Sequence, residues 1–315
     1  MRIAVLDDYQ RVARDYADWD SLGAEVEFFT RHIADRDELV RDLSGFDVVV
    51  AMRERTAFPS AVLERLPELK LLVSTGRRNP AIDVAAARRL GIVVSATGSV
   101  PYPTAEHTWA LILSALRHIP TEVRAMREGG WQSTVGGDLH GRTLGLLGLG
   151  RLGSRVAAVG RAFGMHPIAW SQNLTGEHAA EHGATAVSRR ELFTDADVLS
   201  IHLVLSDRTR GLVGEDELAT MKQESLLVNT SRGPIVDEQA LVAALGHGRP
   251  GHAALDVYDR EPLPADHPLR ALPNALLTPH IGYVTEDVYR TFYRDAVADI
   301  AAYQEGAPIR SLTAE

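Results

Sequence analysis

Three polar side chains, Arg232, Glu261 and His280, each stand shortly after an apolar run of the sequence. An imidazole can accept or donate a proton near neutral pH, and a guanidinium can hold a carboxylate through two parallel hydrogen bonds. A carboxylate beside the imidazole can fix its tautomer and stabilise its protonated form. Taken singly, each residue also suits a structural or surface position. Together they predict proton transfer on a small substrate that carries a carboxylate.

A glycine pattern, read as GLGRLG over residues 148–153, follows the apolar run 143–147 and opens a helical pattern over 151–163. A second apolar run at 167–170 completes a strand–helix–strand unit of about 30 residues, the context in which this pattern binds a dinucleotide. A glycine-rich turn without a ligand is the alternative. In the dinucleotide reading the first glycine allows a tight turn, the second lets the backbone approach a pyrophosphate, and the third lets the helix pack closely. The predicted cofactor-binding residues of this turn are Gly148, Gly150, Arg151, Leu152 and Gly153.

Position 171 follows the second strand of this unit, where an acidic residue commonly holds the ribose 2′-OH of NAD. Here the chain reads Trp170-Ser171-Gln172-Asn173. There is no carboxylate to repel a 2′-phosphate and no Arg or Lys to attract one. The sequence therefore predicts NAD or NADP as the cofactor, with Ser171 at the adenosine ribose, and leaves the choice open.

Short apolar runs alternate with helix-compatible stretches along most of the chain, which predicts an α/β fold with parallel sheets in two halves. The runs cover 2–6, 25–29, 47–51, 69–73 and 91–94, and then 143–148, 167–170, 197–203, 225–230, 251–257 and 275–278. Helices are expected at 35–43, 83–90, 105–118 and 285–304, with Thr104 as the N-cap and Pro120 as the end of the third. Because ligands bind at the carboxyl ends of parallel strands, the three polar side chains are expected to share one crevice.

The length of 315 residues suggests about two domains. Gly98 and two prolines interrupt the pattern near 98–102, and a second boundary is expected near 282–286. The final helix could then return to the first domain.

Composition excludes several functional classes. The net charge of −9 gives no electrostatic footprint for nucleic acid. The absence of cysteine excludes disulfides, thiolate catalysis and cysteine metal sites, and no metal is expected at the active site. No apolar segment approaches the roughly 20 residues that cross a bilayer, so a membrane partner is not expected and a cytoplasmic location is predicted.

Five segments together resemble the D-isomer-specific 2-hydroxyacid dehydrogenases, the family that includes phosphoglycerate dehydrogenases, hydroxypyruvate and glyoxylate reductases, and formate dehydrogenases. In chain order they read TAEHTWALILSALRHI, LHGRTLGLLGLGRLGSRVA, LLVNTSRGPIVDEQALVAAL, ALDVYDREPLP and LTPHIGYVT. The resemblance implies an oxidoreductase that moves a hydride between NAD(P) and C2 of a small D-2-hydroxy acid or 2-keto acid. It also implies a hinge-closing homodimer, with a Rossmann domain at 99–284 inserted into a flavodoxin-like substrate domain formed by 1–98 plus 285–315.

The same resemblance assigns roles to individual residues. Arg232 is implied to bind the substrate carboxylate and carbonyl, and Glu261 to pair with His280 as the acid/base. Asp256 is implied to contact the nicotinamide carboxamide, and Thr230 to lie at the cofactor site.

The loop Thr75-Gly76-Arg77-Arg78-Asn79 departs from the family pattern, because relatives often carry small residues or glycine where the two arginines stand. Backbone N–H groups of this loop hold the substrate carboxylate in the family. Gly76, Arg77, Arg78 and Asn79 are therefore expected at the substrate. The arginine side chains either point to solvent, the common case, or enlarge a positive pocket for a second anionic group, together with Arg53 and Arg55.

Two other functions share this scaffold. A nicotinamide-sensing binding protein, similar to the C-terminal-binding corepressors, is the alternative from another class, because a fold does not fix a function. Formate oxidation is disfavoured, since the additional segments of formate dehydrogenases are not found in this sequence.

Overall fold

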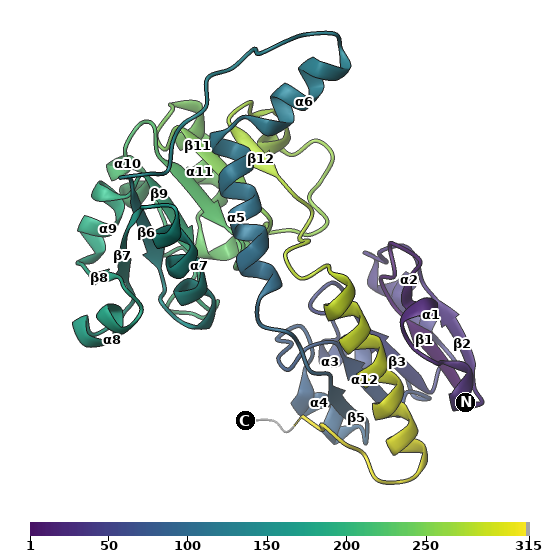
Figure 1. Ribbon diagram of the computed structural model, residues 1–315. Helices are drawn as coiled ribbons and strands as arrows, with labels where there is room; N and C mark the ends of the chain where they lie inside the picture. The colour runs from purple at the N-terminus through teal and green to yellow at the C-terminus, as the bar shows by residue number, and fades with distance from the viewer. Residues whose placement is uncertain (313–315) are drawn as a thin grey trace. The chain divides into compact units, whose positions relative to one another are not determined.

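The computed structural model describes residues 1–312 (Figure 1). The chain divides into two compact units: unit 1 is Met1–Val100 with Val284–Glu315, and unit 2 is Pro101–Tyr283. Unit 2 is therefore inserted into unit 1 along the chain. The boundaries expected at 98/99 and 284/285 fall within two residues of these divisions. No helix among residues 1–312 is long and apolar enough to cross a membrane.

Unit 1 contains a five-stranded parallel sheet with the order β2-β1-β3-β4-β5. This is the flavodoxin-like order that the resemblance implied. Its strands are β1 (Arg2–Val5), β2 (Glu25–Phe28), β3 (Val48–Ala51), β4 (Leu71–Ser74) and β5 (Val93–Ala96). β3 and β4 are buried throughout, as expected for central parallel strands covered on both faces.

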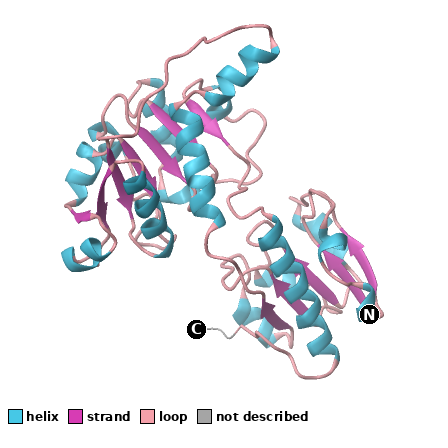
Figure 2. Ribbon diagram, viewed as in Figure 1, coloured by secondary structure: helices cyan, strands magenta, loops and turns pink. Residues whose placement is uncertain are grey.

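Helices cover both faces of this sheet (Figure 2). One core joins alternate strand residues to α2, α3 and α4. On the other face α12 packs on β4 and β5 and contacts α1, so the last helix returns to unit 1. The helices are α1 (Ala13–Tyr16), α2 (Arg36–Leu43), α3 (Ser60–Leu63), α4 (Val84–Arg89) and α12 (Glu286–Gln304), with a 3₁₀ turn at Asp20–Leu22.

Unit 2 contains a seven-stranded parallel sheet with the order β12-β11-β10-β9-β6-β7-β8. Starting from β6, the chain adds β7 and β8 on one side, and then adds β9 to β12 on the other side of β6. This is the Rossmann arrangement, in which ligands bind where the direction changes, between β6 and β9. The strands are β6 (Thr143–Leu147), β7 (His166–Trp170), β8 (Thr185–Ala186), β9 (Val198–Ile201), β10 (Leu226–Asn229), β11 (His252–Leu255) and β12 (Ala275–Leu277).

Two hydrophobic cores lie on opposite faces of this sheet. Leu144 and Leu146 of β6 pack in the core that includes α5, α7 and α8, whereas Leu147 packs in the core of α9, α10 and α11. The helices are α5 (Pro103–Leu116), α6 (Ile119–Arg127), α7 (Arg151–Ala162), α8 (Gly176–Glu181), α9 (Arg189–Asp195), α10 (Glu215–Thr220) and α11 (Glu238–Gly246), with 3₁₀ turns at Gly233–Ile235 and Pro268–Ala271.

The helix expected at 105–118 required correction. α5 begins at Pro103 after Tyr102, so Thr104 lies inside the first turn and is not the N-cap. The helix ends before Arg117, and the left-handed backbone of His118 (φ 50°) redirects the chain into α6. Pro120 stands in the first turn of α6, where its missing N–H costs nothing. The short strand β8 was not predicted.

Candidate active site

His280 and Glu261 form a close pair beyond the carboxyl ends of β12 and β11. The Nδ1 atom of His280 lies 2.6 Å from Oε2 of Glu261, and both side chains are partly buried. The other carboxylate oxygen of Glu261 accepts a hydrogen bond from the backbone N–H of Tyr258 at 3.0 Å. The ring of His280 also packs edge-on against Tyr283. Because Nδ1 faces the carboxylate, Nε2 is the ring nitrogen that can exchange a proton with a substrate.

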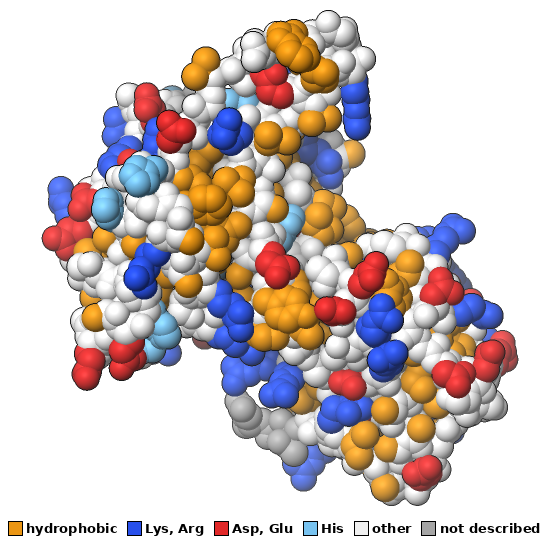
Figure 3. All heavy atoms as spheres, viewed as in Figure 1, with side chains coloured by type: hydrophobic (Ala, Val, Ile, Leu, Met, Phe, Trp, Pro, Cys, Tyr) orange, Lys and Arg blue, Asp and Glu red, His pale blue; other side chains and the backbone are white. Residues whose placement is uncertain are grey.

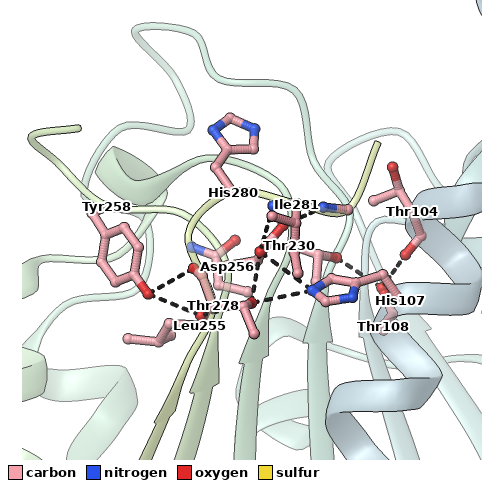
Figure 4. Close-up of polar contacts among 12 residues, drawn as sticks. Thr104, His107, Thr108, Thr230, Leu255, Asp256, Tyr258, Thr278, His280 and Ile281 are labelled. Atoms are coloured by element: carbon pink, nitrogen blue, oxygen red, sulfur yellow. Dashed lines mark hydrogen bonds and ion pairs between the residues drawn. The ribbon is translucent and has the colours of Figure 1, made fainter. Parts of the chain in front are cut away.

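The backbone of His280 is left-handed (φ 54°), which is uncommon for a residue other than glycine. The carboxylate of Asp256 holds this segment from below, as Figure 4 shows. Its Oδ1 accepts from Ile281 N–H at 2.9 Å and from the Thr278 hydroxyl at 2.6 Å, and its Oδ2 accepts from Gly282 N–H at 2.8 Å. Asp256 therefore ties the end of β11 to the loop that carries His280.

Asp256 is almost completely buried but stays acidic. Burial disfavours its charged form, yet hydrogen bonds from His107, Thr278 and Ile281 outweigh burial and hold the pKa of Asp256 below its ordinary value. The protein contacts occupy both carboxylate oxygens, so a supporting role for Asp256 is visible directly. Its implied contact with the nicotinamide carboxamide stays a prediction.

Two members of this network were missed by the sequence reasoning. His107, on α5, places Nε2 3.2 Å from Oδ1 of Asp256 and 3.1 Å from the Thr278 hydroxyl (Figure 4). The hydroxyl of Tyr258 bonds the carbonyl oxygens of Leu255 at 3.1 Å and Thr278 at 2.9 Å. Burial raises the pKa of Tyr258, so its hydroxyl remains a donor. Only folding brings α5 beside β11 and β12, and the sequence holds no local signal for these contacts.

Arg232 projects from a turn after β10 that is fixed by its own polar groups. The amide of Asn229 donates to the Arg232 carbonyl at 3.0 Å and accepts from Ser231 N–H at 3.0 Å. One guanidinium nitrogen of Arg232 bonds the Ser231 carbonyl at 2.7 Å. A Cβ added at Gly233 would lie 2.1–2.6 Å from backbone atoms of residues 258 and 259. The loops after β10 and β11 are therefore packed backbone to backbone, which sets the position of Arg232 relative to the Glu261 loop.

Thr230, also predicted at the cofactor site, is buried at the end of β10. Its hydroxyl lies 2.8 Å from that of Thr108, which also donates to the Thr104 carbonyl at 2.8 Å (Figure 4). Thr230 thus links the strand end to α5.

The three glycines of the 148–153 turn differ in what surrounds them. A Cβ at Gly148 would meet the carbonyl oxygen of His202 at 2.9 Å, and one at Gly153 would meet the Gly148 carbonyl oxygen at 2.2 Å. At Gly150, by contrast, no heavy atom lies within 4 Å of the added Cβ. The open side of Gly150 and the uncapped start of α7 fit a pyrophosphate, because helix N-termini offer N–H donors and a partial positive charge.

Comparisons with known proteins agree with this geometry. The family model described as D-isomer specific 2-hydroxyacid dehydrogenase, NAD binding domain, matches residues 109–282. A glyoxylate reductase of Aeropyrum pernix is 42% identical over 255 residues, covering 78% of this chain and 76% of that protein. The chain belongs to the D-isomer-specific 2-hydroxyacid dehydrogenase family. It is an NAD(P)-dependent oxidoreductase of 2-hydroxy acids and 2-keto acids, and no observation favours the corepressor-like alternative.

Several relatives are much longer, and the chain spans only about half to three fifths of their length. A D-3-phosphoglycerate dehydrogenase of Archaeoglobus fulgidus is 34% identical over 314 residues, which are 99% of this chain but only 59% of that protein. Among solved structures, a phosphoglycerate oxidoreductase from Vibrio cholerae superimposes with a TM-score of 0.93 at 39% identity and covers 98% of this chain and 100% of that one.

Ser171 is the residue predicted at the adenosine ribose, where NAD and NADP differ. It directly follows β7, whose last residue, Trp170, is paired with Leu147 of β6 next to the glycine turn. Ser171 is partly buried and begins a turn closed by the hydrogen bond from Leu174 N–H to its carbonyl. This 2-hydroxyacid dehydrogenase therefore presents a neutral hydroxyl beside the glycine turn.

His202 is a further residue at the glycine turn that the sequence reasoning did not single out. Its backbone N–H donates to the Leu147 carbonyl at 2.8 Å, and its ring bonds the Ser200 hydroxyl at 2.9 Å. Burial lowers the pKa of His202 to about 4. Its ring is therefore neutral at neutral pH and adds no positive charge to the glycine turn.

The predicted substrate loop of the family lies in unit 1, after β4. Arg77 and Arg78 are exposed, whereas Asn79 is buried. The amide of Asn79 donates to the Arg53 carbonyl at 2.6 Å and accepts from Ala81 N–H at 3.0 Å, so this side chain braces the loop.

Gly76 of the same loop adopts a left-handed φ of 84°. A Cβ there would lie 2.0 Å from the Arg53 guanidinium, so glycine lets Arg53 lie against the loop. Arg55 bonds the Asp7 carbonyl at 2.8 Å and stacks over the Tyr9 ring. The roles of Gly76, Arg77 and Arg78 toward a substrate stay predictions.

Proposed function

We propose that this enzyme reduces small 2-keto acids, of the size of glyoxylate or hydroxypyruvate, with His280 as the proton donor. The observation that carries the proposal is the 2.6 Å contact between His280 Nδ1 and Glu261 Oε2. This contact fixes the imidazole ring and directs Nε2 away from the carboxylate. The Aeropyrum glyoxylate reductase, of which this chain matches 76% of the length, supports a small substrate.

The proposed reaction assigns one task to each residue. Arg232 binds the substrate carboxylate bidentately and so orients the C2 carbonyl. When bound, the reduced nicotinamide supplies the hydride to C2. The carbonyl oxygen takes a proton from Nε2 of His280, which becomes neutral and is reprotonated from solvent. Glu261 holds the ring in place through Nδ1, and Asp256 with His107 supports the backbone of His280 and acts as a positioning pair.

The test is a panel of substrates in which turnover is measured as the oxidation of NADH or of NADPH. The panel contains glyoxylate, hydroxypyruvate, pyruvate, phenylpyruvate and phosphohydroxypyruvate. We expect turnover of the smallest acids, and His280→Ala should lower kcat by about 10²–10⁴ while NADH affinity is kept. Near-normal turnover by His280→Ala would remove this residue from the reaction. Turnover of phosphohydroxypyruvate alone would overturn the small-substrate proposal.

Arg77 and Arg78 are tested with the same panel. If either contacts the substrate, acids with a second anionic group should be preferred, and Arg77→Gln with Arg78→Gln should erase the preference. Equal kinetics for singly and doubly charged acids in both proteins would instead assign these side chains to solvent. Because both residues are exposed, the substitutions should leave the free energy of unfolding within about 0.5 kcal/mol.

We further propose that the protein is a homodimer joined through α6 and the segment that follows it. α6 has no buried residue, and its apolar side chains Ile119, Val123 and Met126 recur at the spacing of one helix face. Trp131 is 75% exposed and Val135 is 93% exposed. Figure 3 shows hydrophobic side chains gathered over this part of unit 2, at the top of the view. Exposed apolar patches of this kind mark association sites.

The association is measured by sedimentation equilibrium. The unaltered protein should sediment as a dimer, and Val123→Glu with Trp131→Glu should yield a folded monomer. Leu90→Glu, at an exposed apolar residue of unit 1, is the matched control and should remain dimeric. A monomeric unaltered protein, or a dimer that survives the paired substitution, would refute the proposed interface.

A further inference from the structure

A cluster of three metal-ligating side chains lies at the C-terminal end of α8, apart from the residues assigned above. His178, Glu181 and His182 each offer one donor atom, and these atoms lie within 4.8 Å of one another. Nδ1 of His178 is 3.3 Å from Oε2 of Glu181. The rings of His178 and His182 meet edge to face with centroids 4.7 Å apart.

The helical repeat explains why these side chains converge. Residues three and four apart lie on one face of a helix, and the three residues have this spacing. The Thr175 hydroxyl accepts from His178 N–H and fixes where α8 begins, and His182 is the C-cap residue. The C-terminal end of a helix carries partial negative charge, which favours a bound cation. α8 lies beside β8 at the edge of the unit 2 sheet (Figure 1).

We propose that His178, Glu181 and His182 form a surface site for a divalent transition-metal ion of the Zn²⁺ class. Two imidazoles and one carboxylate are the donor set of many three-residue zinc sites, with water completing the coordination. Donors of a tetrahedral zinc ion lie about 3.4 Å apart, given Zn–N bonds near 2.0–2.1 Å. The His178–Glu181 distance already matches this value. The remaining closure, at most about 1.4 Å from donor distances within 4.8 Å, needs only side-chain rotation of groups that are at least partly exposed.

The donor set also predicts selectivity. Imidazole nitrogen binds Zn²⁺, Ni²⁺ and Cu²⁺, whereas Mg²⁺ and Ca²⁺ take oxygen ligands. α8 has only six residues and buries Ala179 alone among them, so its own stability is small. A metal ion that bridges its last turn should therefore stabilise the helix in addition to binding it.

The experiment is calorimetric titration of Zn²⁺ into the full chain at pH 7.5, after removal of any histidine tag. We expect one zinc ion at this site, and the double variant His178→Ala/His182→Ala should bind it at least about tenfold more weakly. Glu181→Gln should weaken binding by a smaller factor. His247→Ala, at an exposed histidine of α11's C-terminus, is the matched control and should bind as the unaltered protein does. Mg²⁺ in place of Zn²⁺ should give no heat at this site.

Two further measurements separate this site from scattered weak binding by other histidines. Zinc should raise the thermal midpoint of the unaltered protein and of His247→Ala, but not of the double variant. Binding should weaken at pH 5.5, because protons compete for the imidazole nitrogens. Unchanged zinc affinity in the double variant, or no zinc binding by the unaltered protein, would overturn the proposal and leave His178 and Glu181 as a surface ion pair.

Discussion

Replacing Gly150 by alanine should separate cofactor binding from folding. A Cβ at this position has no heavy atom within 4 Å. The backbone of Gly150, with φ −87° and ψ −158°, lies in a region open to any residue. Alanine is a poorer N-cap than glycine, which costs about 0.5–1 kcal/mol of stability. Alanine also reduces the conformational entropy of the unfolded chain, which stabilises the folded state by about 0.4–1 kcal/mol. The free energy of unfolding should therefore change by less than about 1 kcal/mol.

Cofactor affinity should respond differently. The space beside Gly150 is where a pyrophosphate would approach the start of α7, and the methyl group would stand in it. We expect the Kd of NADH to rise by at least about tenfold, which corresponds to about 1.4 kcal/mol. The assays are fluorescence titration with NADH and urea denaturation of the protein without cofactor.

The matched control is Gly153→Ala, in the same turn. Its Cβ would lie 2.2 Å from the carbonyl oxygen of Gly148, a backbone atom that cannot rotate away. This substitution should cost about 1–3 kcal/mol of stability or more. If Gly150→Ala bound NADH as tightly as the unaltered protein, the pyrophosphate would not lie against Gly150. If Gly150→Ala were destabilised as much as Gly153→Ala, the claim that a Cβ at Gly150 meets no neighbouring atom would be contradicted.

Three further predictions concern other parts of the chain. Arg232→Ala should raise the KM for a 2-keto acid strongly and leave NADH affinity unchanged, with only partial rescue by lysine, which lacks the bidentate fork; an unaltered KM would remove Arg232 from the site. Ser171→Asp should shift the ratio of kcat/KM with NADH and NADPH toward NADH, because a carboxylate repels the 2′-phosphate, and an unmoved ratio would place Ser171 away from the ribose. Burial raises the pKa of Asp299 from 3.8 to about 6, despite its bond to Arg310. The folded state therefore holds this proton more tightly, and stability should fall by up to about 3 kcal/mol as pH rises from about 4 to above 6. Urea denaturation across this range should show that the free energy of unfolding falls in the unaltered protein but not in Asp299→Asn. If the free energies of both proteins changed in parallel with pH, Asp299 would not be the group responsible.

The sequence by itself determined the elements whose signals are local. The alternation of apolar runs with helical stretches predicted both parallel sheets, because buried parallel strands are apolar on both faces. The glycine spacing at 148–153 predicted the turn between β6 and α7, since the backbone geometry there depends on neighbouring residues. The order of polar residues after strand ends predicted that Glu261 and His280 would lie in one crevice, because parallel strands align their carboxyl ends at one edge. The family resemblance implied that the two side chains would pair.

Local signals failed where two conformations have similar propensity. Thr104 and Tyr102 both precede apolar positions of α5, and the helix begins at Pro103 with Tyr102 as its N-cap residue. Pro120 is compatible with the end of one helix and the start of another. The left-handed backbone of His118 separates α5 from α6, so Pro120 stands at the start of α6.

The tertiary structure alone decided how the active-site groups are supported. His280 keeps a left-handed backbone because the buried carboxylate of Asp256 accepts two N–H groups from the residues that follow it. Asp256 remains charged in a buried position because His107, on a helix far away in sequence, and Thr278 donate to it. The energies of these contacts depend on desolvation and on distances between segments remote in the chain. Those quantities exist only once α5, β11 and β12 have packed together, and no pattern of neighbouring residues encodes them.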